Sequence, residues 1–333
     1  MNFSRDQDGK YILEDYGAHG YEKLHLTQVS GAKDGASSSF WLEGKDKKYL
    51  VKSSLKPEYI VSVYGELLFS ELAKMNGLPC ANVDAGNLGG IDMVISEDVC
   101  EEGSERLTYD MLCEIGEYSD YSIEGICEKV NIFAKKNNIE CQKDLRLQLY
   151  KYALMDYLCC QSDRHEENLL FEIVDQSGKK TIRLCPLYDN ELAFMFGYVQ
   201  DHIDDIPLPQ VVQISVKVNH VFHPVLGTDF DVQSFRHAVA GDVVKMLKNK
   251  QLDKLVLKRF ANSFAIEIMN NPELKKFYDN LDFSIFKAAK EIEKETNFKI
   301  PYDYLRLAED VVYERQQLLD QEIKDYKEMV LGE

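Results

Sequence analysis

The stretch from residue 161 to residue 194, QSDRHEENLLFEIVDQSGKKTIRLCPLYDNELAF, decides how this chain is interpreted. Its apolar runs LLFEIV and TIRLC flank the turn-forming residues DQSGKK and predict a β-hairpin. Asp163 and Asn168 precede the hairpin, and Asp189 follows it. Because a hairpin doubles the chain back, we expect these three polar side chains to meet at one end of the strand pair.

These three residue types suit the transfer of a phosphoryl group. A carboxylate must orient the attacking hydroxyl, while an amide oxygen and a second carboxylate hold Mg²⁺ against the phosphates of ATP. The spacing Asp163-x4-Asn168 is that of a kinase catalytic loop. Each residue alone is more readily explained by turn and backbone contacts. Together with Asp189 they favour an ATP-dependent kinase, with Mg²⁺ or Mn²⁺ bound by Asn168 and Asp189.

The D-R-H-x-x-N run that starts at Asp163, and the apolar-Pro-Leu-Tyr-Asp run that ends at Asp189, resemble the HipA-like serine/threonine kinases. These kinases are a branch of the protein-kinase-like fold related to phosphoinositide kinases. The resemblance implies that Asp163 is the catalytic base and that Asn168 and Asp189 are the magnesium ligands. His165 is implied as a supporting or phosphate-facing residue, and a histidine that only braces the loop is an equally good interpretation.

A lysine and a glutamate upstream fit the same function. Lys52 ends the predicted strand KYLVKS, where alternation directs its ammonium into a cleft. A kinase needs such a cation for the ATP phosphates, and a carboxylate on the following helix to hold it. That helix is predicted over 58–76, with a stop at Gly-Leu-Pro. Glu66 is preferred for this role, with Glu58 and Glu71 as competitors.

The Gly/Ser-rich turn VSGAKDGASSS lies one strand before Lys52 and offers N–H groups to a phosphate. It resembles the phosphate loop of HipA-like kinases, which implies nucleotide contacts from Ser30, Gly31, Ala32 and Lys33. Lys33 departs from that family's pattern, which has glutamine there. In the family a serine of this loop can be autophosphorylated, and Ser30 is the matching position. An ordinary turn serine is the alternative interpretation of Ser30.

The order of these motifs predicts an α+β, two-lobed protein-kinase-like fold. A small sheet-rich lobe would occupy 1–99 and a larger helical lobe 100–333. The hinge between them is predicted at 95–98, where the backbone of Ile95 and Glu97 would receive the adenine. Helices of the second lobe are predicted near 107–116, 122–136, 142–160, 234–249, 252–270, 283–295 and 302–329.

Composition excludes several other classes. The 333 residues carry a net charge of −18, which disfavours direct binding to nucleic acid. No apolar run approaches the roughly 18 residues that a membrane span needs, and the N-terminus is too polar for a signal peptide. The expected location is therefore the cytoplasm. The eight cysteines are scattered without a Cys-x-x-Cys pair, which indicates reduced thiols rather than disulfides or a zinc site.

The substrate implied by the resemblance is a protein Ser or Thr hydroxyl of unknown identity. HipA toxins usually carry an extra N-terminal subdomain, which this chain is expected to lack, although a separately encoded antitoxin stays open as a partner. The segment 192–233 would hold substrate elements, and its histidines are interpreted as ordinary loop residues. The alternatives are a phosphoinositide-type lipid kinase, which the negative charge disfavours, a nucleotide-binding pseudokinase, and a purely structural interaction protein.

Overall fold

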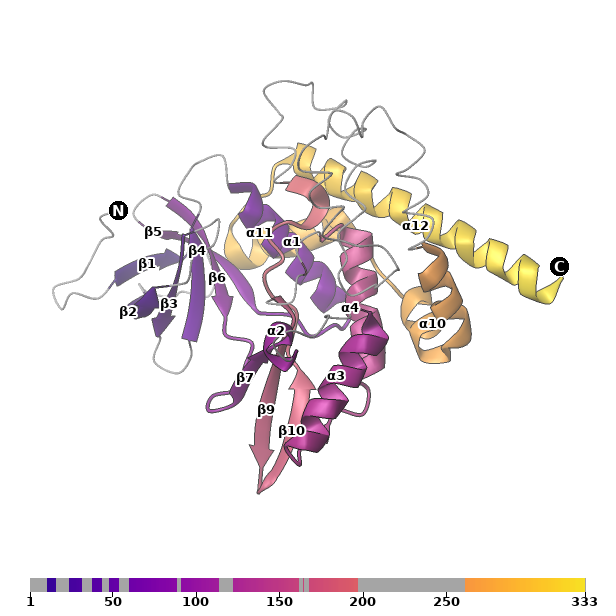
Figure 1. The fold of residues 1–333 in the computed structure, drawn as a ribbon. Helices are drawn as coiled ribbons and strands as arrows, with labels where there is room; N and C mark the ends of the chain where they lie inside the picture. The colour runs from indigo at the N-terminus through magenta and orange to yellow at the C-terminus, as the bar shows by residue number, and fades with distance from the viewer. Residues whose placement is uncertain are drawn as a thin grey trace, which may run out of the picture. The chain divides into compact units, whose positions relative to one another are not determined.

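The computed structural model describes two compact units (Figure 1). Unit 1 comprises Met1–Val99, Pro186–Asp201 and Phe283–Ala308, and unit 2 comprises Cys100–Cys185, His202–Asp282 and Glu309–Glu333. The first segment of unit 1 ends where the sequence placed the lobe boundary, but its two later segments had been assigned to the second lobe. The residues described are 11–15, 24–31, 38–43, 48–53, 60–88, 91–113, 122–161, 164, 168–196 and 261–332.

Unit 1 contains a closed barrel of antiparallel strands in the order β1-β2-β3-β4-β6-β5. The strands are β1 (Tyr11–Asp15), β2 (Leu24–Gly31), β3 (Ser38–Glu43), β4 (Lys48–Ser53), β5 (Val83–Leu88) and β6 (Ile91–Glu97). Pairing of β1 with β5, at Glu14 and Asn87, closes the barrel. The predicted strand KYLVKS is confirmed as β4. On β4 the consecutive residues Val51 and Lys52 are both buried.

Helix α1 (Ile60–Met75) lies within the predicted range 58–76, and its side chains Tyr64, Leu67, Leu68 and Leu72 are buried. It ends as predicted, because Gly77 has a φ of +67° and its N–H donates to the carbonyl of Lys74. The helix contacts β5, β6 and helix α11 (Ile285–Thr296), as Figure 1 shows.

Aromatic side chains explain why two late segments belong to unit 1. The ring of Tyr64 on α1 lies 5.8 Å from that of Phe298 and 5.1 Å from that of Tyr304. Phe196 packs edge-to-face on Tyr304 at 5.3 Å. Each such aromatic pair stabilises the folded state by about 0.5–1.5 kcal/mol, in addition to the stabilisation that comes from burying its apolar surface. Residues far apart in sequence are thereby packed against one face of α1.

Unit 2 contains a second sheet in the order β7-β9-β10-β8, of which only the pair β10–β8 is parallel. The strands are β7 (Glu105–Thr108), β8 (Glu140–Cys141), β9 (Leu170–Gln176) and β10 (Lys179–Leu184). The predicted hairpin is confirmed as β9 and β10. Its loop is Ser177–Gly178, and both residues have a positive φ, as a two-residue type I′ turn requires.

The helices of unit 2 agree with the sequence in part. Helices α3 (Ile123–Lys136) and α4 (Leu145–Cys159) confirm the predictions for 122–136 and 142–160. The helix predicted near 107–116 is confirmed in part: helix α2 (Tyr109–Leu112) lies within this range, but strand β7 occupies residues 107 and 108 and the helix ends before Cys113. Residues 114–116 lie outside the described residues.

At the C-terminal end, the predictions for 283–295 and 302–329 are confirmed by α11 and by α12 (Tyr302–Leu331). Helix α10 (Pro272–Asp279) was not predicted. Residues 261–270 are helical, whereas the rest of 252–270, the predicted helix 234–249 and the segment 197–233 lie outside the described residues.

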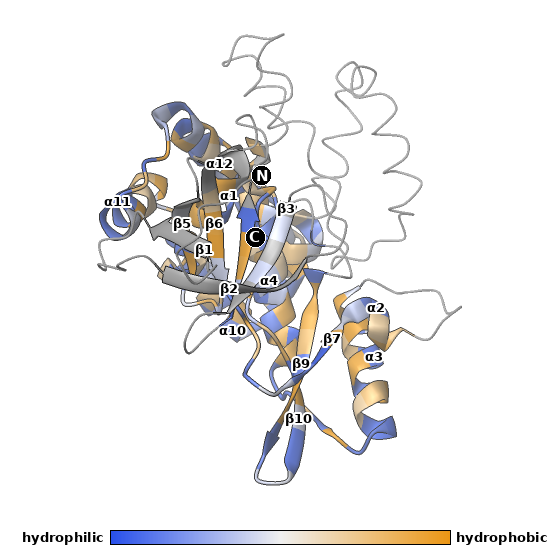
Figure 2. Cartoon of the chain, turned by 90° about the vertical axis from the view of Figure 1, so that its left-hand side faces the viewer, coloured by the Kyte–Doolittle hydropathy of each residue, from blue (hydrophilic) through white to orange (hydrophobic). Residues whose placement is uncertain are grey.

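Burial follows the two sheets. Figure 2 shows apolar residues concentrated on β6 of the barrel and on β9, which lies between β7 and β10 in the second sheet. Among the residues that the structure describes, no helix is both long enough and apolar enough to cross a membrane.

Candidate functional site

The charged cluster of unit 1 is centred on Lys52 of β4. Its Nζ atom donates a hydrogen bond to the carboxylate of Asp189 and lies 3.7 Å from Oε2 of Glu191. The Lys52 side chain is 10% exposed, and those of Asp189 and Glu191 are 25% and 19% exposed. The lysine is therefore nearly buried, while the two carboxylates keep some contact with the surface.

Electrostatics keep Lys52 protonated in this position. Burial favours the neutral amine, but the carboxylates of Asp189, Glu66 and Glu191 outweigh it and raise the pKa of Lys52 above its ordinary value. The site thus holds a fixed cation of the kind that binds phosphate oxygens. Carboxylates outnumber the ammonium around it, and carboxylate oxygen is the ligand that Mg²⁺ prefers. The residues present fit a metal-bound triphosphate.

Glu66 of α1 fixes the residue that follows Asp189. The backbone N–H of Asn190 donates to Oε2 of Glu66 at 2.6 Å, and Nδ2 of Asn190 donates to Oε1 at 3.2 Å. Both side chains are buried. Asp189 itself has a φ of 56°, in the left-handed region that Asp and Asn tolerate better than most residues. The hydrogen bonds of Asn190 therefore help to hold Asp189 in a backbone conformation that is otherwise uncommon.

Gly65, the neighbour of Glu66, lets α1 approach this segment closely. A Cβ atom at Gly65 would lie 2.6 Å from the carbonyl oxygen of Glu191, and real Cβ contacts are essentially never that short. The obstructing atom belongs to the backbone, so a side-chain rotation cannot relieve the overlap. A glycine in the middle of a helix lowers its stability relative to alanine by roughly 0.5–1 kcal/mol, so this close approach explains its presence.

We expect Gly65→Ala to displace the segment that carries Asp189. Overpacking of a closely packed position costs about 1–3 kcal/mol, which outweighs the gain in helix propensity. Urea unfolding should show the loss, and the rate of phosphate transfer should fall with it. Lys74→Ala, at an exposed position of the same helix, is the control and should change neither quantity. A Gly65→Ala protein as stable as the wild type would contradict the close approach.

Unit 2 holds the start of the predicted catalytic loop by a buried ion pair. Nε of Arg164 donates to Oδ2 of Asp156 on α4 at 3.1 Å, and an Nη atom donates to Oδ1 at 3.1 Å. Only 2% of the Arg164 side chain and 1% of the Asp156 side chain are exposed. Such a two-point contact fixes both the position and the orientation of the guanidinium. Asn168 is also buried.

The end of α4 is fixed by further polar contacts. Cys160 caps the helix with a φ of 54°, and the N–H of Gln161 donates to the carbonyl of Asp156 at 2.9 Å. Arg315 of α12 donates to the carbonyl of Tyr157 at 2.5 Å, and another of its nitrogens lies 3.1 Å from Sγ of Cys160. These contacts fix the C-terminal end of α4.

The structure brings together three residues that the sequence proposed for the site, Lys52, Glu66 and Asp189, all in unit 1. Asn168, the other proposed metal ligand, belongs to unit 2. Ser30 and Gly31 end strand β2, although the sequence placed them in a turn. Ala32, Lys33, Asp163 and His165 lie outside the described residues.

The predicted hinge begins inside strand β6, which contains Ile95 and Glu97. The N–H of Glu97 donates to the carbonyl of Asn82 at 2.9 Å, and that of Asp98 donates to the carbonyl of Lys48 at 3.0 Å. These two donors are engaged within the barrel. Adenine recognition by Ile95 and Glu97 stays a prediction.

Sequence reasoning missed the residues that position the others. Asn190 and Glu191 directly follow Asp189 in the run Y-D-N-E, so their proximity to the motif was the available signal. Arg164 lies inside the D-R-H-x-x-N run and was quoted only as part of the motif. Gly65 was itself a signal, because a glycine in the middle of a predicted helix often marks close packing.

Comparisons with known proteins rest on structure. No protein-family model matches the chain, and no curated protein matches it in sequence. Among solved structures, the proinflammatory kinase CtkA of Helicobacter pylori matches with a TM-score of 0.57 and 13% identity over 94% of this chain and 97% of that one.

A second match is HipA of Shewanella oneidensis, in a complex with HipB and operator DNA. Its TM-score is 0.43 and its identity 14%, over 90% of this chain and 67% of that one, and a likeness this distant carries no argument. At these identities a match shows the fold alone. The match to CtkA over nearly the whole of both chains gives this chain the two-lobed α+β fold of the protein-kinase-like proteins.

Proposed function

We propose that the chain is an ATP-dependent protein kinase that transfers the γ-phosphate to Ser or Thr hydroxyls. The observation that carries this proposal is the cluster of Lys52 and Asp189, with Glu66 bonded to the next residue, Asn190. It supplies a protonated lysine, a carboxylate for a metal ion, and a helix glutamate beside both. A protein-kinase-like fold needs these parts for phosphoryl transfer.

Each proposed residue has a separate task. The ammonium of Lys52 binds phosphate oxygens of ATP, and the segment from Ser30 to Lys33 covers the phosphates. Asp163 accepts the proton of the attacking hydroxyl, with His165 supporting the loop. Asn168 and Asp189 hold Mg²⁺, for which Mn²⁺ is a substitute. When bound, the metal would neutralise part of the negative charge of the phosphates.

A protein acceptor is favoured over a lipid by charge. The chain carries 57 acidic and 39 basic residues, and a net charge of −18 opposes approach to an anionic membrane. Its own chain is one candidate acceptor, with Ser30 as the expected position. A phosphate there would add about −1.5 to −2 charges where those of ATP must bind, so phosphorylation at Ser30 would inhibit the enzyme. A cytoplasmic location and a separately encoded antitoxin stay predictions from the sequence.

The acceptor is identified by incubating the purified protein with ATP, Mg²⁺ and either generic protein substrates or phosphoinositide vesicles. We expect phosphoserine or phosphothreonine in the protein fraction, and mass spectrometry to locate any autophosphorylation. Asp163→Asn protein is the control and should give neither. Phosphate found only in the lipid fraction would overturn the proposal in favour of a lipid kinase. Binding of ATP without transfer to any acceptor would indicate a pseudokinase.

A further inference from the structure

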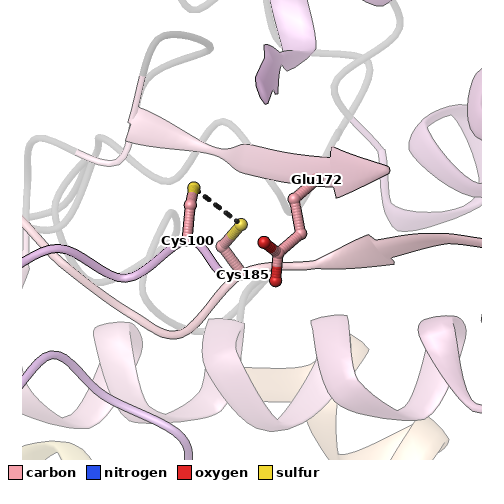
Figure 3. A group of neighbouring side chains, drawn as sticks. All are labelled: Cys100, Glu172 and Cys185. Atoms are coloured by element: carbon pink, nitrogen blue, oxygen red, sulfur yellow. Dashed lines mark hydrogen bonds between the residues drawn. The ribbon is translucent and has the colours of Figure 1, made fainter. Parts of the chain in front are cut away.

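A second cluster of metal-binding side chains lies in unit 2. Cys100, Cys185 and Glu172 point toward one another from the chain after β6, the end of β10 and strand β9 (Figure 3). Their ligand atoms lie within 4.8 Å of one another. The two Sγ atoms are 3.7 Å apart, and the residues are 9%, 2% and 1% exposed. Two thiols and a carboxylate therefore lie close together in a buried site.

The distance between the sulfur atoms fits a shared metal ion. A zinc–sulfur bond is about 2.3 Å long, so two thiolates on a tetrahedral zinc ion lie about 3.8 Å apart. The observed separation of Cys100 and Cys185 is 3.7 Å. The sulfur atoms of a disulfide are only about 2.05 Å apart. The two cysteines are therefore already spaced as ligands of one tetrahedral ion.

Glu172 is oriented as metal-binding carboxylates are. Its Oε1 accepts a hydrogen bond from Nε of Arg183 at 2.8 Å, and its Oε2 accepts one from the N–H of Glu101 at 2.8 Å. Oε1 also lies 2.8 Å from an Nη atom of Arg183, whereas Oε2 has a second lone pair that can bind a metal ion. Outer hydrogen bonds of this kind fix the orientation of metal ligands in known sites.

Charge also favours a divalent ion. Arg183 balances the carboxylate of Glu172, and the further partner of Arg183, Glu101, is exposed to solvent. Two thiolates in this buried place would leave two negative charges uncompensated, which one divalent cation neutralises.

We propose that Cys100, Cys185 and Glu172 form a zinc site, with a fourth position for a small ligand such as water. Two sulfur ligands and one oxygen ligand suit Zn²⁺ better than Mg²⁺ or Ca²⁺. No local motif reveals this site, because its cysteines are 85 residues apart and form no Cys-x-x-Cys pair. This proposal does not depend on the kinase proposal.

The place of the site in the chain gives the ion a structural task. Cys100 is the first residue of unit 2, and Cys185 is the last residue before the chain returns to unit 1 at Pro186. A metal ion would join the two connecting segments at the points where they leave unit 2. We therefore expect Zn²⁺ to raise the melting temperature of the protein, since it binds only the folded chain.

Cobalt titration of the fully reduced, full-length protein tests the site. With excess Mg²⁺ present to saturate oxygen-rich sites, Co²⁺ should give a thiolate charge-transfer band and the strong visible absorption of tetrahedral cobalt. Both should saturate at one equivalent and disappear when Zn²⁺ is added. The Cys100→Ser and Cys185→Ser proteins should each lack the thiolate charge-transfer band when one equivalent of Co²⁺ has been added. Arg183→Gln, which changes no ligand, should weaken binding about 10–100-fold.

Cys113→Ser is the matched control, because Cys113 is a half-buried cysteine outside the cluster, and it should bind cobalt like the wild type. Circular dichroism verifies that each variant is folded. The wild-type titration is decisive even where a variant does not fold. A folded, reduced wild type without a thiolate band would overturn the zinc site, as would a band that survives in folded Cys100→Ser and Cys185→Ser proteins. Mild oxidation that joins Cys100 to Cys185, in a protein that binds no cobalt through sulfur, would indicate a redox pair instead.

Discussion

Replacing Asp189 by asparagine is expected to lower the rate of phosphate transfer at least about 10²–10³-fold, the usual cost of losing one preorganised electrostatic group at a reacting centre. Asparagine keeps the shape of the side chain and also tolerates the left-handed backbone at this position. Lys52 keeps Glu191 as a charged neighbour at 3.7 Å. The variant should therefore fold, and its melting temperature should change little. Steady-state transfer of labelled phosphate measures the effect.

Asp279→Asn is the matched control for this variant. Asp279 makes an exposed ion pair with Lys275 one helical turn away, a type of pair that is worth about 0.3–0.5 kcal/mol. The control should transfer phosphate like the wild type. A folded Asp189→Asn protein that retains more than about a tenth of the wild-type rate would contradict the role proposed for Asp189, since the smallest expected loss is about 10²-fold.

Removing the carboxylate of Asp156 is expected to cost about 3–5 kcal/mol of unfolding free energy. The Asp156→Ala change would remove the carboxylate that binds the buried guanidinium of Arg164 at two points, and breaking a buried ion pair by removing one partner is strongly destabilising. Urea unfolding followed by circular dichroism measures the loss. Phosphate transfer should fall as well, because Arg164 is the neighbour of Asp163.

A double variant separates the buried charge from the buried volume. Asp156→Leu combined with Arg164→Met replaces the pair by apolar side chains and should recover part of the lost stability, as replaced buried ion pairs do elsewhere. Asp279→Ala, which breaks an exposed pair, should cost less than about 0.5 kcal/mol. If the Asp156→Ala protein lost no more unfolding free energy than the Asp279→Ala protein, the ion pair between Asp156 and Arg164 would not be what fixes Arg164 in place.

The sequence predicted the elements whose signals are local. The β9–β10 hairpin followed from two apolar runs around Ser-Gly, and the end of α1 followed from Gly77. Helix α10 also had a local signal that went unused, since Asn271 accepts hydrogen bonds from two backbone N–H groups at its start and Pro272 occupies the first turn. The candidate catalytic and metal-binding residues were predicted because phosphoryl transfer needs those residue types in that order.

Contacts between distant segments could not be predicted in the same way. Glu66 and Asn190 are 124 residues apart, and nothing in either local sequence reveals that they bond. The closure of the barrel by β1 and β5, and the return of Phe298 and Tyr304 to α1, likewise depend on packing in three dimensions. Sequence reasoning expected Glu66 to hold Lys52. The structure shows that Glu66 bonds to Asn190, the residue after Asp189.

The most direct test of the kinase proposal is the transfer of labelled γ-phosphate from ATP by the purified wild-type protein, with Mg²⁺ and with a chelator. The account predicts label in protein acceptors, or in the chain itself, only with Mg²⁺, and its loss in Asp163→Asn and Asp189→Asn proteins. A folded wild type that binds ATP and transfers no phosphate to protein, to itself or to lipid would contradict the account.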